Sequence, residues 1–353
     1  MPDPRPLHLA LVGATGAVGQ EMLAILAERN FPIASLRLFA SPRSLGQSAT
    51  FRNEKIPYRT LTPDAFQGLD LALFSAGASI SRAWSPIARA AGAVVIDNSS
   101  AFRADPACPL VIPEVNGDEL ATASPAHPAI VSVPNCSAII LLMALTPLQR
   151  AFGIDRIVAS TYQAVSGAGA RAIDELRTQT AAALAGTPLT RAVFPEPCAF
   201  NLFSHNAPVD PISGLNGEEA KVISETRRIW RDPAVRISIT CIRVPVIRAH
   251  SIAINVTLAT PATLDQVRTT LAAAPGLSLL DDRAANAFPT PLKAQGQDAI
   301  LVGRLREDPS QLPARFAPGA PTLAFDLFIS GDQLRKGAAL NAVQIAEAVF
   351  QQR

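Results

Sequence analysis

The cysteine best suited to covalent chemistry is Cys136, which lies in the segment VPNCS (133–137), directly before an apolar stretch of helical character. A cysteine at a helix N-terminus has its thiolate stabilised by the helix dipole and by free backbone amides, which makes it a nucleophile. A buried structural thiol is the more common role of a single cysteine. We assign that role to Cys108, Cys198 and Cys241 and expect Cys136 to be reactive.

A candidate acid–base partner is His250, which follows the arginine-rich segment RVPVIRA (243–249). The other histidines are expected in the first strand (His8), in a loop (His127) and in a loop-rich stretch (His205). A Cys–His pair can perform nucleophilic and acid–base steps. Their spacing along the chain does not show whether they meet in space, so a satisfied core histidine is the default interpretation of His250.

Two further segments could bind charged ligands. Glu218 and Lys221 open a predicted helix at spacing i,i+3, where one could hold an ammonium and the other an anion. A surface ion pair is the more frequent outcome for such a pair. The segment NSSAFR (98–103) follows a predicted strand and could present Arg103 at the carboxyl edge of a sheet, where ligands bind in open α/β folds.

A glycine-rich turn, GATGAVG at 13–19, follows a predicted strand and opens a helix. Gly13 would permit the tight turn, Gly16 would let a pyrophosphate approach the backbone, and Gly19 would let helix and strand pack closely. Helix N-terminal amides would then bind the phosphates. An ordinary glycine-rich turn is the alternative, but the strand–turn–helix context favours a dinucleotide site.

The end of the second strand indicates which dinucleotide binds. NAD sites usually place an acid there to bond the ribose 2′-hydroxyl. This chain instead has Ser41, Arg43 and Ser44, a cluster that suits a 2′-phosphate because guanidinium binds phosphate with paired donors. We therefore predict NADP, with a solvated loop arginine as the alternative.

The elements that must position these residues fall into two groups. Strands are expected at 7–12, 36–39, 69–74 and 93–96, with a helix at 20–29, which predicts βαβ units and a parallel sheet. The second half predicts an α+β domain with helices on one face. It contains an apolar helix within 132–152, a strand at 156–164, helices at 170–185 and 265–274, a loop-rich stretch at 186–217, and strands at 235–246 and 249–258 that alternate like antiparallel strands. A terminal amphipathic helix is expected at 336–351, with Ala338, Ala342, Ile345 and Val349 on one face.

Composition excludes several classes of protein. The 353 residues are 48% hydrophobic and 17% charged, enough apolar material for a core, and the net charge of +2 with no basic stripe argues against nucleic acid as a partner. The longest apolar run, 138–145, is shorter than a membrane span needs. The four cysteines form no C-x-x-C pair, so we expect neither a zinc site nor a disulfide framework, and no metal. The first eight residues hold three prolines and no apolar stretch, so no secretory signal is expected and we predict a cytoplasmic protein.

Taken together, these segments resemble the aspartate-semialdehyde dehydrogenase family from Leu7 to about Glu347. The ordered motifs that carry the resemblance are GATGAVG (13–19), SAGAS (75–79), NSSAFR (98–103), PNCS (134–137), TYQAVSGAG (161–169), NGEEAK (216–221), RVPVIRAHS (243–251) and LRKGAALNAVQIAE (334–347).

The resemblance implies a role for each matching residue. Cys136 would form an acyl thioester, Gln163 would orient the acyl group, and His250 would be the general acid/base. Arg243 would bind the substrate α-carboxylate and Glu218 its ammonium, while Arg103, Asn135 and Lys221 would hold phosphate. The residues expected to bind NADP are Gly13, Thr15, Gly16, Ala17, Val18, Gly19, Ser41, Arg43 and Ser44, with Ser166, Gly167 and Asn341 nearer the nicotinamide.

The implied reaction is the NADPH-dependent, reversible reduction of L-4-aspartyl phosphate to L-aspartate-4-semialdehyde and phosphate, in lysine, threonine, methionine and isoleucine biosynthesis. The implied domains are a Rossmann-type NADP-binding domain, 1–133 completed by 334–353, and a catalytic and dimerisation α+β domain, 134–333. A homodimer or homotetramer is expected.

Two alternatives share the scaffold. N-acetyl-glutamyl-phosphate reductase would be expected to have glycine in place of Asn135 and no group for a free ammonium, so Glu218 argues against it. A catalytically silent homologue would lack the cysteine and the arginine–histidine segment, both of which this chain has. The loop around His205 departs from the family pattern, because Ser204 stands where proline is expected in many members.

Overall fold

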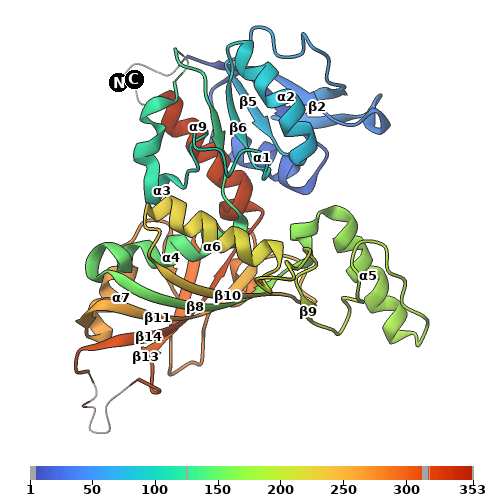
Figure 1. The fold of residues 1–353 in the computed structure, drawn as a ribbon. Coiled ribbons are helices and arrows are strands. Elements are labelled where there is room, and N and C mark those ends of the chain that lie inside the picture. The colour runs from blue at the N-terminus through green and yellow to red at the C-terminus, as the bar shows by residue number, and fades with distance from the viewer. Residues whose placement is uncertain (1–4, 125, 312–316, 318, 352–353) are drawn as a thin grey trace. The chain divides into compact units, whose positions relative to one another are not determined.

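The computed structural model describes residues 5–124, 126–311, 317 and 319–351. The chain divides into two compact units (Figure 1). The first comprises the residues up to Asn135 together with the segment from Ala338 onward, and the second comprises Cys136–Gly337. The boundaries expected from the sequence, 133/134 and 333/334, lie a few residues away from these.

The first unit is a doubly wound sheet with the strand order β3-β4-β2-β1-β5-β6-β7, in which only the pair β3–β4 is antiparallel. The crossovers β1–α1–β2 and β5–α2–β6 share one hand and lead in opposite directions along the sheet, so α1 and α2 cover opposite faces. The predicted α/β class is therefore confirmed. The strands are β1 (Leu7–Val12), β2 (Ile33–Phe39), β3 (Ser48–Phe51), β4 (Glu54–Arg59), β5 (Leu71–Phe74), β6 (Val94–Asp97) and β7 (Ile130–Ser132), and the helices are α1 (Ala17–Glu28), α2 (Ala78–Ala90), α3 (Pro113–Asn116) and α9 (Leu340–Gln351).

The second unit is a mixed sheet with the strand order β12-β13-β14-β11-β8-β10-β9. Helices α4, α6 and α7 pack together on one face of it (Figure 1), as an α+β domain predicts. The strands are β8 (Ile154–Gln163), β9 (Phe203–Ser204), β10 (Arg236–Arg243), β11 (His250–Ala262), β12 (Leu277–Leu279), β13 (Ile300–Glu307) and β14 (Thr322–Gly331), and the helices are α4 (Cys136–Phe152), α5 (Ala170–Leu184), α6 (Gly217–Trp230), α7 (Leu264–Ala272) and α8 (Pro291–Ala294).

One strand direction differs from the expectation. The segments at 235–246 and 249–258 were expected as antiparallel strands, and β11 is antiparallel to both β8 and β14. Strand β10, however, runs parallel to β8 and is separated from β11 by it. Alternating burial identifies a half-covered strand but carries no information about the direction of its neighbours.

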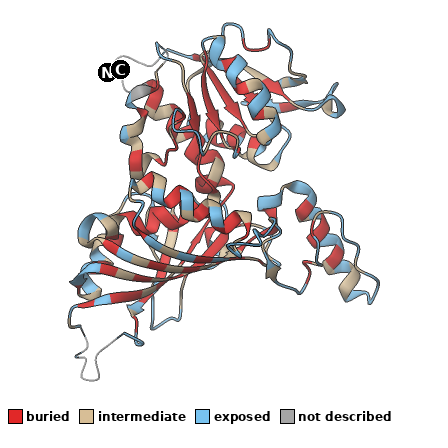
Figure 2. Ribbon diagram, viewed as in Figure 1, coloured by how far each residue is buried: buried red, intermediate tan, exposed pale blue. Residues whose placement is uncertain are grey.

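The apolar stretch after Cys136 forms a helix that is buried on all sides. In α4 every residue from Ser137 to Thr146 is buried, because the sheet covers one side of this helix while α6 and α7 cover others (Figure 2). An apolar surface all round is the pattern of a core helix in a protein of this size. Within the described part of the chain, no helix is long and apolar enough to span a membrane.

The terminal helix starts later and is more buried than expected. A π-helical turn, Arg335–Ala339, precedes α9, and the amide of Gly337 donates to the carbonyl of Asp332 across it. Ala338 therefore lies in the turn and not on the helix face. Ala342, Ile345 and Val349 are buried as predicted, but so are Leu340, Val343 and Ala346 on other sides of the helix. Gln344, Glu347 and Ala348, at spacing i, i+3 and i+4, are only half-buried. The helix is therefore amphipathic as predicted, with a wider buried face than expected.

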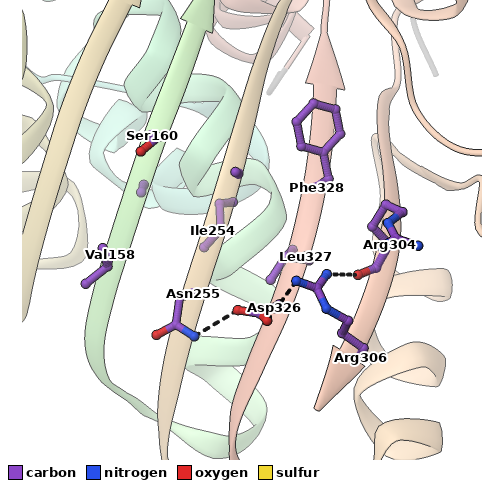
Figure 3. A pocket seen from close by; sticks show the side chains of 11 residues that line it. Val158, Ser160, Ile254, Asn255, Arg304, Arg306, Asp326, Leu327 and Phe328 are labelled. Carbon is purple, nitrogen blue, oxygen red and sulfur yellow. Dashed lines mark hydrogen bonds and ion pairs between the residues drawn. The ribbon is translucent and has the colours of Figure 1, made fainter. Parts of the chain in front are cut away.

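The uncovered face of the second sheet is hollowed and partly apolar. Figure 3 shows the hollow, about 380 Å³ in volume, where half-buried Val158 and Phe328 lie beside polar groups. Asp326 accepts a hydrogen bond from Asn255 at 2.9 Å and forms an ion pair with Arg306 at 2.9 Å. Successive side chains of a strand point to opposite faces of the sheet, so these residues lie on the face opposite the helices.

Candidate active site

The glycine loop of the first unit leaves no room for side chains at two positions. Gly13 has a φ of +88°, and a Cβ there would lie 2.4 Å from the carbonyl oxygen of Ser75. A Cβ at Gly19 would lie 2.3 Å from the carbonyl oxygen of Gly13. The tight turn and the close helix–strand packing predicted from the sequence are therefore present.

The N-terminus of α1 presents backbone amides without a side-chain cap. Its N-cap residue is Gly16, and the first-turn amides have no acceptor within the helix. Thr15 and Gly16 are exposed, and Ala17 and Val18 are half-buried. A Cβ at Gly16 would meet only the Gly13 carbonyl, at 3.4 Å, so the approach to these amides is open. The loop fits the phosphates of a dinucleotide.

The loop after β2 carries no acid and one available cation. Pro42–Ser44 form a 3₁₀ turn, in which Arg43 is exposed and Ser44 is half-buried, and Ser41 before it is exposed. Arg43 makes no hydrogen bond or ion pair with the described residues. These groups suit a phosphate at the end of the second strand.

Arg103 ties together the loops that follow β6 and β7. Its Nε donates to the carbonyl of Val133 at 2.8 Å and its Nη2 to the carbonyl of Asn98 at 2.9 Å. Asn135, at the end of the same unit, is buried. The two amide atoms of Asn98 are buried and lack hydrogen-bond partners among the described residues. Polar groups therefore gather beyond the carboxyl ends of these strands.

Cys136 is the first residue of α4 and the only partly exposed thiol among the four. A Cβ at Gly337 would lie 3.1 Å from the Cβ of Cys136, so glycine there leaves the thiol room. Burial raises the pKa of the Cys241 thiol to about 12 and also raises the pKa of Cys198. Buried and protonated, those thiols are poor nucleophiles, whereas the dipole of α4 favours the thiolate of Cys136.

The register of the second sheet brings three predicted site residues together where the neighbouring strands β8 and β10 end and β11 begins. Gln163 and Arg243 end the parallel strands β8 and β10 and are direct partners in the ladder. His250 begins the antiparallel strand β11 on the other side of β8, at the same edge. Because β8 and β10 are parallel, their carboxyl ends meet, and residues 80 apart in sequence become neighbours.

Arg243 is almost fully buried, with 3% of its surface exposed. Its Nη1 donates to the carbonyl of Ala164 at 2.8 Å, and the ring of Phe194 lies 5.4 Å from its guanidinium carbon. Burial lowers the pKa of Arg243, while the charges of Cys136 and Glu218 oppose that shift. The guanidinium thus lies within electrostatic reach of the nucleophile.

His250 is completely buried, and its hydrogen bonds assign its tautomer. The amide of Ala164 donates to Nδ1 at 3.0 Å, so the neutral ring carries its proton on Nε2. Nε2 has no partner among the described residues, and a Cβ at Gly167 would lie 3.4 Å from it. Burial and the Arg243 charge hold the pKa of His250 well below its ordinary value, and the Ala249 carbonyl opposes this more weakly. His250 is therefore a neutral donor and not a satisfied core histidine.

Glu218 and Lys221 form the i,i+3 ion pair, at 3.6 Å, but Glu218 is buried, unlike a surface pair. Asn216 caps α6 by accepting from the amides of Glu218 and Glu219. The Gln163 amide lies 3.5 Å from the Glu218 carboxylate, within donating distance. A carboxylate is thus held beside the edge that carries Gln163.

The residues expected near the nicotinamide have other partners. Gln333 Nε2 donates to the hydroxyl of buried Ser166, and Gly167 is exposed. Asn341 is fully buried in the first unit, and its Nδ2 donates to the carbonyl of Val111 at 2.9 Å. Their contacts with a cofactor remain predictions.

The structure also adds residues to which the sequence assigned no role in the site. His205 and Asn206 lie against Arg243, and Ala164 links Arg243 to His250 through its carbonyl and its amide. Backbone groups and loop side chains of this kind leave no periodic signal. No cluster of three or more metal-binding side chains occurs among the described residues.

Family models match both halves of the chain. Residues 8–123 match the semialdehyde dehydrogenase, NAD binding domain, and residues 145–336 match the semialdehyde dehydrogenase, dimerisation domain. An aspartate-semialdehyde dehydrogenase of Synechocystis sp. is 47% identical over 99% of this chain and 98% of that protein. The chain belongs to the aspartate-semialdehyde dehydrogenase family.

Other members of the family agree in sequence and in structure. The Bacillus subtilis aspartate-semialdehyde dehydrogenase is 40% identical over 98% of each chain. The crystal structure of aspartate semialdehyde dehydrogenase II from Vibrio cholerae, complexed with ASA, has a TM-score of 0.90 and 40% identity, and the match covers 99% of each chain. The family resemblance inferred from the motifs is confirmed.

Proposed function

We propose that this protein reduces L-4-aspartyl phosphate to L-aspartate-4-semialdehyde and phosphate with NADPH, reversibly, in the biosynthesis of lysine, threonine, methionine and isoleucine. The observation that carries the proposal is the partly exposed Cys136 at the start of α4, in one unit with Gln163, Arg243 and His250 at one sheet edge. The family relatives named above support the same reaction.

Cys136 forms a covalent intermediate with the substrate and later releases it. Its Sγ bonds to the acyl carbon as the bond from that carbon to the phosphate oxygen breaks. The departing phosphate takes up one proton from solvent, and an acyl thioester remains on Cys136. When bound, NADPH supplies the hydride for that carbon. The carbon–sulfur bond then breaks, and Cys136 recovers its thiolate as the aldehyde leaves.

His250 supports this sequence as a hydrogen-bond donor. Cys136 begins and ends as a thiolate, so the ring need not remove a proton from it. Nε2–H can donate to the oxyanion that develops on the acyl oxygen. To act as a base at Nε2, the neutral ring would have to carry its proton on Nδ1. Nδ1 could then no longer accept the hydrogen bond from the Ala164 amide. Gln163 would orient the acyl group from the neighbouring strand end.

The family resemblance assigns substrate recognition mainly to charged side chains. Arg243 would bind the α-carboxylate and Glu218 the ammonium, since a buried cation and a buried anion each gain most from an opposite charge. Phosphate would bind to Arg103, Asn135 and Lys221, of which Lys221 is partly exposed.

We assign cofactor binding to the domain 1–133 with 334–353, and catalysis and dimerisation to 134–333. The open amides at Gly16 support a dinucleotide of either kind, whereas Arg43, which has no partner among the described residues, supports NADP over NAD. The matched family description reads NAD binding, which leaves the choice to experiment. We place the enzyme in the cytoplasm, where its acyl-phosphate substrate would be made.

A homodimer would form through the uncovered face of the second sheet. That face exposes part of Phe328 and Val158 around the hollow in Figure 3, and it belongs to the segment matched as a dimerisation domain. Partly exposed apolar groups on a broad sheet favour association with a second copy. A homotetramer would need a further surface.

Phosphate-dependent reduction of NADP by L-aspartate-4-semialdehyde tests the proposed function. We expect turnover that requires both phosphate and Cys136, and loss of turnover in Cys136→Ala with NADP binding retained. Turnover in Cys136→Ala at the wild-type rate would exclude the covalent route. No turnover by the wild type would favour the catalytically silent homologue.

A further inference from the structure

The buried guanidinium of Arg243 has a side-chain partner outside the predicted site. Its Nη2 lies 2.7 Å from Nε2 of His205 and 3.3 Å from Oδ1 of Asn206. Its Nη1 donates to the carbonyl of Ala164, and its Nε has no partner among the described residues. His205 therefore makes the shortest of the bonds that orient this cation.

The backbone holds the His205 ring in place. His205 directly follows β9, which pairs with the end of β10, and its amide donates to the carbonyl of Cys241 at 2.8 Å. The ring is thus attached to the strand that carries Arg243.

The charge state of His205 decides what it can do. Burial lowers the pKa of His205 to about 4; the Glu218 carboxylate opposes this shift, and the Arg243 and Lys221 charges add to it. The ring is therefore neutral near pH 7. Arginine has donors only, so Nε2 must accept from Nη2. The ring proton then lies on Nδ1, so the Ala207 amide, 3.2 Å from Nδ1, cannot donate to it in this state.

The geometry of a guanidinium makes this bond important for carboxylate binding. A carboxylate bonds to arginine in parallel through Nε and Nη2 or through Nη1 and Nη2, so both forks require Nη2. The Ala164 bond engages Nη1, which leaves Nε and Nη2 as the open edge. A bound carboxylate would replace the longer contact with Asn206, while His205 keeps its bond.

We propose that His205 is a positioning residue that holds Arg243 with its Nε–Nη2 edge toward the substrate α-carboxylate, and that it sets the preference for substrates bearing that group. This inference rests on the proposed function. The competing explanation is that His205 only anchors its loop.

The test compares two aldehydes in His205→Leu, in His205→Gln and in the wild type. L-Aspartate-4-semialdehyde carries the α-carboxylate, and 3-aminopropanal is the same aldehyde and ammonium without it. We expect His205→Leu to lower kcat/KM for the semialdehyde by about tenfold to a hundredfold, the range for one lost hydrogen bond to a charged group. With 3-aminopropanal the change in kcat/KM should be small, so His205→Leu should lose most of the preference for the semialdehyde over 3-aminopropanal.

The variants separate positioning from structural support. The glutamine oxygen reaches the place of Nε2, so His205→Gln should restore most of the preference, whereas the shorter His205→Asn should not. Ser204→Ala is the matched control, because this exposed side chain lies at the end of β9, next to His205, and has no partner among the described residues. If His205→Leu does not fold, the Gln and Asn variants provide the comparison.

Equal losses for both aldehydes, or an unchanged preference in His205→Leu and His205→Asn, would overturn the inference. If the wild-type protein reduces NADP with the semialdehyde while either of these results is obtained, the proposed function stands and only the role of His205 is refuted. A wild type inactive on the semialdehyde refutes the proposed function, and this inference with it.

Discussion

Replacing Arg243 with lysine should separate carboxylate recognition from phosphate recognition. The substitution keeps the charge but removes the planar group that reaches Ala164 through Nη1 and His205 through Nη2. It also removes the flat surface beside the ring of Phe194. A lysine ammonium is a single point of donation and cannot form a fork with two carboxylate oxygens.

The size of the effect follows from the bonds that lysine cannot replace. One lost hydrogen bond from a charged donor costs about 1.5–3 kcal/mol, which corresponds to about tenfold to a hundredfold. The carboxylate lies away from the reacting carbon, so its binding also orients that carbon against Cys136. We expect kcat/KM for the semialdehyde to fall by at least this factor in Arg243→Lys.

The assay varies one substrate at a time. Initial rates are measured against the semialdehyde, phosphate and NADP separately, and NADP affinity is measured by fluorescence titration. The semialdehyde constant should rise while the phosphate constant and NADP affinity stay unchanged, and Arg103→Ala should instead alter the phosphate dependence. If Arg243→Lys mainly raises the phosphate requirement, Arg243 is a phosphate ligand and our division of roles is wrong.

Four further variants test the cofactor loop, the cofactor choice and the uncovered sheet face. Gly19→Ala forces a Cβ to within 2.3 Å of a backbone oxygen and should lower Tm. Gly16→Ala places its Cβ 3.4 Å from the nearest atom, so this variant should keep its Tm and bind NADP more weakly. Equal Tm values for the two variants would contradict the packing argument. Arg43→Ala should weaken NADP by about tenfold to a hundredfold and NAD little; equal loss in cofactor titrations would mean that Arg43 does not bind the 2′-phosphate. Phe328→Arg should yield monomers in analytical ultracentrifugation if the uncovered face is the dimer interface, and an unchanged dimer would locate the interface elsewhere.

Local patterns predicted much of the framework. The strand before Gly13, the turn and the helix after it follow from an apolar run, glycines and helical spacing within a few residues. Cys136 as the first residue of a buried helix follows in the same way from Pro134 and the apolar stretch. Such signals are local, so tertiary contacts did not need to be known.

Long-range pairing explains what the sequence could not show. The parallel pairing of β10 with β8 places Arg243 opposite Gln163, yet no feature of either strand encodes that direction. The bond between His205 and Arg243 depends on the two-residue strand β9, which is too short for a periodic pattern. The wide buried face of α9 likewise depends on neighbours distant in sequence, including Val111.

The covalent role of Cys136 is tested most directly by mass spectrometry of the wild-type protein, quenched rapidly during turnover of the semialdehyde and NADP without phosphate. We predict an acyl adduct on the peptide that contains Cys136, and none on that peptide in Cys136→Ala. The buried Cys198 and Cys241, whose pKa values are raised, should remain unmodified. An adduct on Cys108, Cys198 or Cys241, or turnover with no adduct on any cysteine, would contradict the mechanism.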